Sequence, residues 1–328
     1  MRAPAFWDAA ATGPWPVLLS PLSAAWRLGG ALRRLATTPA RAPVPVICVG
    51  NLVAGGAGKT PVVAAVVDTL RSLGARPHVL TRGFGGRLRG PVRVDPDRHT
   101  WREVGDEPLL HARQAPTWVA RDRAAGARAA AAEGAEGGAD VVVMDDGLQN
   151  PGLAKDLSLL VVDGGFGFGN GRVMPAGPLR EPLRQGLARA DAVVLIGEDR
   201  RGVAARIPGE MGPPIRARLV PRPEAEVLTG RKVVAFAGIG RPEKFFATLE
   251  EIGAEVVARH GFADHHPYTP DEVMRLVEDA TDADAVPVTT EKDHVRLPDD
   301  AKAMVTVLPV ALEWARPEAI EDLLRSLL

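Results

Sequence analysis

The sequence of 328 residues lacks the features that mark secreted, nucleic-acid-binding or membrane-spanning proteins. Cys48 is the single cysteine, so no disulfide can form within the chain and a reducing compartment is expected. The formal net charge is −1, which gives no global reason to expect a nucleic acid partner. The longest apolar stretch near the start is shorter than the ~20 residues that span a bilayer. No small-residue cleavage site clearly follows it, so a signal peptide is not expected.

What the sequence contains is typical of a globular protein. Hydrophobic residues make up 46% and charged residues 25%, and the length suffices for one large core or two adjoining ones. Cys48 lies in the apolar run "VPVICVG", where we expect a buried side chain and not a reactive thiol.

The first 45 residues differ from the rest in charge and texture. Residues 15–35, "WPVLLSPLSAAWRLGGALRRL", combine tryptophan, leucine and arginine. Residues 1–45 carry five arginines against Asp8, a local net charge of +4. Such a segment suits a helix lying in an anionic membrane surface, and it equally suits a helix packed on its own domain.

From residue 43 onward, short apolar runs ending in polar residues alternate with helical patterns. This rhythm predicts an α/β fold with a mainly parallel, doubly wound sheet of the P-loop NTPase kind. Residues 208–230 are rich in proline and read as a boundary, after which a second, smaller α/β unit begins. Two domains with a cleft between them are therefore expected.

The stretch "GNLVAGGAGKTP", residues 50–61, resembles a phosphate-binding loop. It departs from the pattern G-x-x-x-x-G-K-[ST] because Val53 stands where the first glycine is expected. Glycines let backbone N–H groups converge on a phosphate, Lys59 would reach the β- and γ-phosphates, and Thr60 would hold Mg²⁺. We therefore predict a nucleotide site at Asn51, Gly55, Gly56, Ala57, Gly58, Lys59, Thr60 and Pro61.

Two pairs of carboxylates follow other predicted strands. Asp145 and Asp146 end the run "ADVVVMDD", the layout in which a carboxylate holds Mg²⁺ directly or through water, although such residues also cap turns. Asp106 and Glu107 begin a probable helix, where they could be N-terminal caps, a second metal ligand or a base for a substrate hydroxyl. The sequence leaves those alternatives open.

Three further stretches are candidates. Arg82 follows a strand within "TRGFGG" and could contact an anion, and residues 169–183 form a long loop that carries Arg180 and Glu181. The triplet at residues 264–266, "DHH", invites a metal interpretation, but neighbouring histidines on a strand point to opposite faces. We favour a single histidine paired with a carboxylate across the cleft.

These fragments occur together in one known family. "VGNLVAGGAGKTP", "TRGFGG", "GDEPLL", "DDGLQN", "GNGRVMPAGPLREPL", "FADHHPY" and "TTEKDHVRL" occur in the order found in tetraacyldisaccharide 4'-kinases, the lipid A 4'-kinases of Gram-negative bacteria. The resemblance runs from about residue 15 to the C-terminus. The phosphate-loop sequence of that family also lacks the first glycine, as here at Val53. The N-terminal stretch is similar to the membrane-associating helix of the family.

The resemblance implies transfer of the γ-phosphate of ATP, with Mg²⁺, to the 4'-hydroxyl of a tetraacylated glucosamine disaccharide 1-phosphate, giving lipid IVA. It implies a membrane-associating segment at residues 1–40, a P-loop kinase domain at 41–222, and a smaller α/β domain at 223–328 that closes over the nucleotide. The expected location is peripheral, on the cytoplasmic face of the bacterial inner membrane. The oligomeric state stays open.

The resemblance also implies roles for individual residues. Asp106 matches the proposed catalytic base and His265 its partner, while Lys59 and Thr60 match the phosphate and Mg²⁺ positions. A metal role is expected for Thr60 and Asp145. Other matching positions, expected to line the active site or bind substrate, are Glu107, Asp146, Gln149, Arg180 and Glu181, with weaker expectations for Arg82 and Arg123.

The sequence departs from the family in two places, and two other functions are alternatives. Asn150 stands where histidine is usual and Phe84 where tyrosine is usual, which puts the roles of both positions in doubt. A deviant P-loop switch ATPase acting through partners would carry another lysine near the start of the loop, where Val53 and Ala54 stand. A metal phosphohydrolase built on "DHH" would need further ligand clusters.

Overall fold

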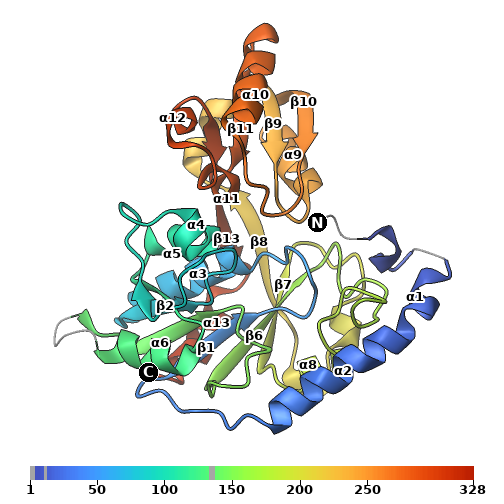
Figure 1. The fold of residues 1–328 in the computed structure, drawn as a ribbon, viewed down its shortest axis with the longest axis vertical. Helices are drawn as coiled ribbons and strands as arrows, with labels where there is room; N and C mark the ends of the chain where they lie inside the picture. The colour runs from blue at the N-terminus through green and yellow to red at the C-terminus, as the bar shows by residue number, and fades with distance from the viewer. Residues whose placement is uncertain (1–3, 11–12, 133–136) are drawn as a thin grey trace.

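The computed structural model describes residues 4–10, 13–132 and 137–328, in which a large α/β unit lies beside a smaller one (Figure 1). In these residues nine strands form the large sheet, in the order β13-β8-β7-β6-β1-β5-β2-β4-β3. Neighbouring strands are parallel except at the two edges, where β13 and β3 run antiparallel. The strands are β1 Val46–Gly50, β2 Pro77–Thr81, β3 Val92–Arg93, β4 Thr117–Val119, β5 Val141–Asp145, β6 Leu157–Asp163, β7 Ala192–Ile196, β8 Ile215–Pro221 and β13 Val310–Trp314.

Strand β1 lies at the centre of this sheet because every one of its residues is apolar or small and fully buried. Burial raises the pKa of the Cys48 thiol to about 12, so this cysteine is a buried apolar residue, as expected. The chain leaves β1 for helix α3 (Lys59–Ser72), and later strands pair with β1 on both sides, β5 on one flank and β6 on the other. This is the switch point at which open α/β sheets bind ligands.

Helices cover the large sheet and connect its strands. Helix α3 buries a row of valines and Leu70 against the sheet, and α13 packs beside α3. The helices of this unit are α3 Lys59–Ser72, α4 Trp101–Val104, α5 Asp106–Ala112, α6 Arg123–Ala132, α8 Leu183–Leu187 and α13 Pro317–Arg325, with 3₁₀ turns η2 Ala204–Arg206 and η3 Gly209–Met211. The predicted doubly wound α/β fold is confirmed.

The smaller unit has its own sheet and core. Its described strands are all parallel, in the order β10-β9-β11-β12, and bury an apolar cluster of their own. Its elements are η4 Pro223–Leu228, β9 Lys232–Ala237, α9 Pro242–Glu251, β10 Glu255–Gly261, α10 Pro270–Asp282, β11 Val286–Thr290, α11 Glu291–His294, α12 Asp299–Lys302 and β12 Thr306–Leu308.

The chain passes between the two units twice. It leaves the large sheet after β8 and returns in β13, which pairs antiparallel with β8, and the backbone N–H of Arg222 donates to the carbonyl of Pro309 at the crossing. The last strand and helix α13 therefore belong to the large sheet, and the small sheet is carried on a two-stranded stem (Figure 1).

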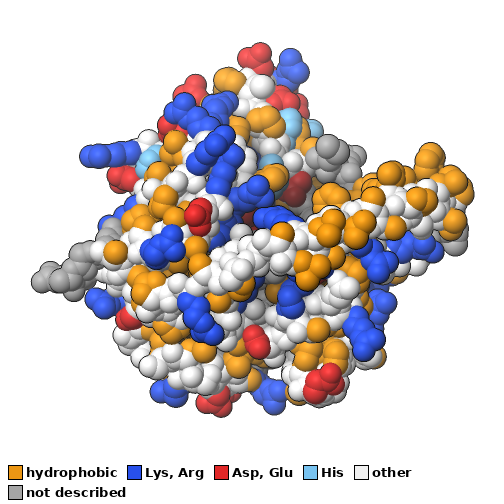
Figure 2. Space-filling view, turned by 60° about the horizontal axis from the view of Figure 1, so that its bottom comes forward, with side chains coloured by type: hydrophobic (Ala, Val, Ile, Leu, Met, Phe, Trp, Pro, Cys, Tyr) orange, Lys and Arg blue, Asp and Glu red, His pale blue; other side chains and the backbone are white. Residues whose placement is uncertain are grey.

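The N-terminal segment is helical and lies along the outside of the large unit. It comprises η1 Ala5–Trp7, α1 Trp15–Leu18 and α2 Ser20–Leu35. Pro16 and Ser23 are buried residues of this segment, whereas hydrophobic side chains lie exposed along the ridge that α1 and α2 form (Figure 2). Among the residues described, no helix is both long and apolar enough to cross a membrane.

Candidate active site

The loop between β1 and α3 has the backbone of a phosphate site. Gly58 precedes the helix with φ +83°, a backbone conformation that favours glycine, and a Cβ there would lie 2.7 Å from Cδ1 of Ile196. Val53 forms a bridge with Leu179 in the extended backbone that valine prefers. The missing glycine at the loop's entry is thus replaced by pairing with the 169–183 loop.

Lys59 begins α3 and points into the site. Its Nζ lies 3.4 Å from Oδ1 of Asn51 and 3.7 Å from Oδ1 of Asp146. Asn51 is fully buried and its amide also donates to the carbonyl of Val53, which fixes the loop's shape. Lysine is a phosphate binder in such loops, and here it is held toward the carboxylates that follow β5.

Asp145 and Asp146 end β5 in different surroundings. Asp146 has a left-handed backbone, with φ +50°, and both of its oxygens accept from Nη1 of Arg180 at 2.7 and 2.9 Å. Burial would raise the pKa of Asp146, but the charges of Lys59 and Arg180 outweigh it and lower that pKa. Asp145 is fully buried: its Oδ2 lies 3.1 Å from Nε2 of His111, and its Oδ1 has no hydrogen-bond partner among the described residues.

The 169–183 loop brings Arg180 and Glu181 to the same edge. Gln149 joins them, since its amide donates to Oε1 of Glu181 at 3.0 Å and its Oε1 accepts from Arg180 at 3.3 Å. Helix α2 holds this loop from outside: the indole N–H of Trp26 donates to the carbonyl of Arg180, and the hydroxyl of Ser23 donates to that of Val173.

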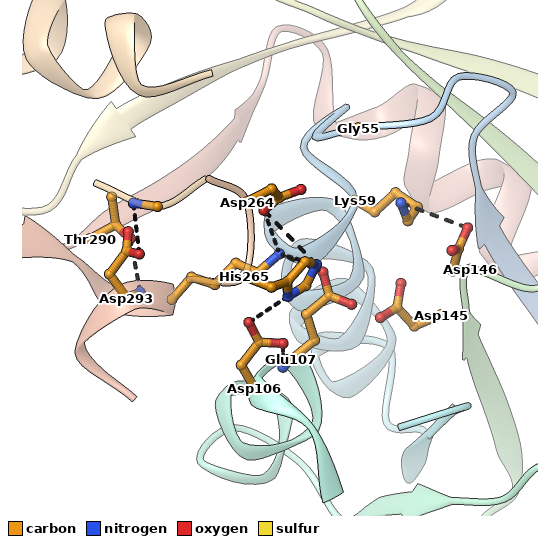
Figure 3. A network of polar contacts seen from close by, with 12 residues as sticks. Gly55, Lys59, Asp106, Glu107, Asp145, Asp146, Asp264, His265, Thr290 and Asp293 are labelled. Carbon is orange, nitrogen blue, oxygen red and sulfur yellow. Dashed lines mark hydrogen bonds and ion pairs between the residues drawn. The ribbon is translucent and has the colours of Figure 1, made fainter. Parts of the chain in front are cut away.

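Asp106 and His265 meet across the two units. Asp106 begins α5 in the large unit, is 4% exposed, and its Oδ2 lies 2.9 Å from Nδ1 of His265 in the small unit (Figure 3). His265 has φ +59°, a conformation that non-glycine residues adopt mostly where the surrounding structure requires it. The structure therefore pairs one histidine with a carboxylate, as the sequence predicted.

Two cations missed by the sequence reasoning contact this pair. Nη1 of Arg296 donates to Oδ2 of Asp106 at 2.7 Å. Nζ of Lys292 lies 3.4 Å from Nε2 of His265 and donates to Oε1 of Glu107 at 3.1 Å. Burial would raise the pKa of Asp106, but the hydrogen bond from His265 and the charges of Lys292 and Arg296 hold it well below its ordinary value. Both cations lie in "TTEKDHVRL", a motif whose resemblance to the family indicates no role for either residue.

His266 and the possible metal site at residues 264–266 are the next two points. His266 contacts Glu272 at 3.2 Å and stacks on Phe262, so the adjacent histidines serve separate partners. In residues 4–10, 13–132 and 137–328, no group of three or more His, Cys, Asp or Glu side chains is placed to hold a metal ion. The ring of Phe84 is exposed and lies 5.3 Å from that of His265.

Three remaining positions lie at different depths. Arg123 is buried and donates to the carbonyl of Ala120, and burial lowers its pKa to about 10, so it does not lie on an open surface. Arg82 is exposed at the end of β2. The side chain of Asn150 accepts from the backbone N–H of Gly152 and shapes its own turn.

Comparison with known proteins gives a single answer. A sequence profile described as "Tetraacyldisaccharide-1-P 4'-kinase" matches residues 15–328. Curated proteins named tetraacyldisaccharide 4'-kinase are 60% identical in Rhodospirillum centenum, over 100% of this chain and 97% of the relative, and 55% identical in Paramagnetospirillum magneticum, over 98% of both. The crystal structure of the "apo" form of LpxK from Aquifex aeolicus in complex with ATP superposes with a TM-score of 0.73 at 27% identity, covering 95% of this chain and 99% of that one.

Proposed function

The chain belongs to the tetraacyldisaccharide 4'-kinase family and is an ATP-dependent kinase of lipid A biosynthesis, and we propose that its reaction is carried out by Asp106 and His265 at the meeting of the two units. The observation that carries this proposal is the 2.9 Å contact between Oδ2 of Asp106 and Nδ1 of His265. It lies beside a phosphate loop, so the acceptor hydroxyl and the γ-phosphate of ATP can meet there.

The phosphate loop and the carboxylates of β5 hold the nucleotide. The backbone N–H groups of residues 55–60 and the ammonium of Lys59 bind its phosphates. Thr60 and Asp145 would hold Mg²⁺, which supplies charge neutralisation of the γ-phosphate when bound. The buried Oδ1 of Asp145, which has no partner in the described part of the chain, fits that ligand, since Mg²⁺ is bound by one or two carboxylates together with phosphates.

Asp106 receives the proton of the 4'-hydroxyl. In phosphoryl transfer the bond to the leaving oxygen is largely broken in the transition state, so the base mainly orients the hydroxyl and takes its proton late. A carboxylate with a lowered pKa is ionised at neutral pH and can do this, and His265 holds it in place. Gln149, Arg180 and Glu181 line the same edge, and Arg180 orients Asp146.

The division into units supports a closing motion. We propose residues 41–222, together with β13 and α13, as the kinase domain, and the segment from η4 to β12 as the smaller domain. The second domain expected at 223–328 therefore ends before β13, because that strand pairs with β8 of the large sheet. Because the base and its histidine come from different units, the site is complete only when they are together, which limits hydrolysis of ATP by water. Contacts between Gly240 and Gly56 support this, since a Cβ on Gly240 would lie 2.6 Å from the backbone N of Gly56.

The segment 1–40 attaches the enzyme to the cytoplasmic face of the inner membrane. Support comes from the exposed leucines of α2, among them Leu28 and Leu32, and from Arg27 and Arg33 on the same helix. The expectation that this segment packs on its own domain is met only in part, because α2 contacts the 169–183 loop through polar groups while its leucines stay exposed.

Transfer of label from [γ-³²P]ATP, followed by thin-layer chromatography, tests the assignment. We expect label to move to tetraacyldisaccharide 1-phosphate with the wild-type protein and to fall by about 10²- to 10⁴-fold with Asp106→Ala, because a positioned base contributes that much. ATP binding should persist in the variant. Release of labelled phosphate without labelled lipid would instead support the switch ATPase.

A further inference from the structure

The segment from Thr290 to Leu297 has no role in the mechanism above, yet it is built rigidly against the Asp106–His265 pair. Asp293, fully buried, accepts from the backbone N–H of Gly238 at 2.8 Å and from the hydroxyl of Tyr268 at 2.9 Å. Thr290 caps α11 by accepting from the backbone N–H of Asp293 at 3.0 Å. The segment is thereby fixed to the small unit, and its side chains Lys292 and Arg296 contact residues of the large unit.

Arg296 is the deeper of the two cations and is 2% exposed. It donates to Oδ2 of Asp106 at 2.7 Å and to the carbonyl of Gly238 at 2.9 Å, and it pairs with Asp293. A guanidinium suits this position because its fixed fork of N–H groups can satisfy several acceptors at once. Arg296 therefore anchors the carboxylate of Asp106 to the small unit.

Lys292 lies on the other side of His265. Its Nζ is 3.1 Å from Oε1 of Glu107, 3.4 Å from Nε2 of His265 and 3.8 Å from Oδ1 of Asp264. Burial alone would lower the pKa of Lys292, but the charges of Glu107, Asp106 and Asp264 outweigh it and raise that pKa. Lys292 is therefore an ammonium, which can donate hydrogen bonds but accept none.

This geometry selects one tautomer of His265. Nε2 faces an ammonium at 3.4 Å and can only accept, so the ring proton belongs on Nδ1, which then donates to Oδ2 of Asp106 at 2.9 Å. The carboxylate of Asp264 does not compete, because its Oδ1 lies 3.9 Å from Nε2, beyond hydrogen-bond distance. The ring nitrogens are thus distinguished by their neighbours.

The same contacts distinguish the two oxygens of Asp106. Oδ2 accepts from both His265 and Arg296, which fills its two lone-pair directions. Oδ1 accepts from the backbone N–H of Glu107 at 2.9 Å and has one direction left. The oxygen available to a substrate hydroxyl is therefore Oδ1.

We propose that Lys292 and Arg296 are positioning residues of the kinase: Lys292 fixes His265 as the Nδ1–H tautomer, Arg296 fixes Oδ2 of Asp106, and together they leave Oδ1 to accept the proton of the sugar hydroxyl. The proposal rests on the catalytic roles proposed above for Asp106 and His265. It gives the motif "TTEKDHVRL" a function in this reaction.

The test uses Lys292→Met in the full-length protein, because Lys292 is partly exposed whereas loss of the buried Arg296 can prevent folding. The chain has seven histidines, so ¹⁵N-histidine NMR can resolve their ring nitrogens, with His265→Ala assigning the signal. We expect wild-type His265 to carry its proton on Nδ1 and Lys292→Met to show the Nε2–H form as well. Lys232→Met, at an exposed lysine of β9, is the matched control and should match wild type.

Kinetics provide the second readout. We expect Lys292→Met to lower kcat by about 10- to 100-fold, by analogy with partners that orient metal-bound histidines, with the KM for ATP near that of the control. Lys292→Arg, which keeps a cationic donor, should restore part of the rate. A thermal unfolding midpoint equal to that of the control would show that folding is intact.

The outcomes separate this proposal from the one on which it rests. If Lys292→Met keeps a pure Nδ1–H tautomer, or keeps the control's kcat although the tautomer changes, the positioning role is wrong. If Asp106→Ala and His265→Ala also keep wild-type turnover, the catalytic pair itself is wrong. Loss of turnover in those two variants together with an unaffected Lys292→Met would overturn the positioning role alone.

Discussion

At the scale of single residues, the site depends on positions where one side chain or none is tolerated. Gly58 has a left-handed backbone and faces Ile196, and His265 and Asp146 adopt the same unusual backbone region at the points where the two units supply chemistry. Such conformations cost free energy and persist where surrounding contacts impose them. The function is therefore sensitive to small changes at these residues.

Gly58→Ala tests the steric part of this account. The added methyl would meet Cδ1 of Ile196 at 2.7 Å and would also strain the backbone, so we expect a loss of about 2–3 kcal/mol in the free energy of unfolding. Ile196→Val removes that Cδ1 and should recover part of the loss in the double variant. Denaturant unfolding of the four proteins of the cycle measures this, and strictly additive effects would contradict a direct clash.

Site residues are easiest to propose from the sequence where they are consecutive in the chain. The phosphate loop could be proposed because its glycines, lysine and threonine are consecutive. The residues alone predicted one histidine paired with a carboxylate, and only the resemblance to the family indicated that these are His265 and Asp106. Lys292, Arg296 and His111 were missed, since a charged side chain near a helix ordinarily faces solvent and a histidine in an apolar helix ordinarily packs in the core. The burial of these side chains depends on contacts between segments that are distant in the sequence.

At the scale of elements, α2 connects the outer surface to the active-site loop. Trp26 and Ser23 hold the 169–183 loop that carries Arg180, while the leucines on the rest of the helix face outward (Figure 2). The sequence left a membrane helix and a packed helix as alternatives because its composition suits both. The structure contains polar contacts on one side and exposed apolar side chains on the other.

Leu28→Glu and Leu32→Glu test the proposed attachment to membranes. Burying a leucine in an apolar environment contributes about 1.5–3 kcal/mol, so each variant should bind vesicles containing anionic lipid at least tenfold more weakly in a sedimentation assay. Val227→Glu, at an exposed valine of the small unit, is the matched control. Equal sedimentation of all four proteins would rule out insertion of this face.

At the scale of the whole molecule, the two units are held together by charge as well as by the catalytic pair. Asp163, at the end of β6, forms ion pairs with Arg241 and Lys244 of the small unit. Burial would raise the pKa of Asp163. Arg241 and Lys244 donate hydrogen bonds to it and carry positive charges, and together these effects outweigh burial and lower that pKa. The sequence could predict two units and a cleft between them. It could not predict this contact, because Asp163 lies in one unit and its two cations lie in the other.

Asp163→Asn gives a prediction with a defined pH dependence. The folded pKa lies below the unfolded value, so the ionised form stabilises the fold above about pH 4, and this contribution is lost as pH falls through the folded pKa. At pH 7 we expect the free energy of unfolding of the variant to be about 1–2 kcal/mol lower than that of wild type. This figure is small for a buried ion pair because Lys244 is partly exposed and solvent screens its charge.

Thermal unfolding from pH 7 down to about pH 3 measures the gap between wild type and variant, with the exposed Asp282→Asn as control. The gap should narrow at the acid end. A gap that stays constant over this range would contradict an ionised Asp163 as the cause.

The central claim is that Asp106 and His265 act as one catalytic unit assembled from the two parts of the chain. The most direct measurement is a double-mutant cycle on single-turnover transfer of phosphate to the lipid, with Asp106→Ala, His265→Ala and the double variant. Residues that act as a unit are non-additive, so we predict that the double variant is about as slow as the slower single variant, with nucleotide affinity retained in all three. Rate losses that multiply, or a single variant with wild-type turnover, would contradict the claim.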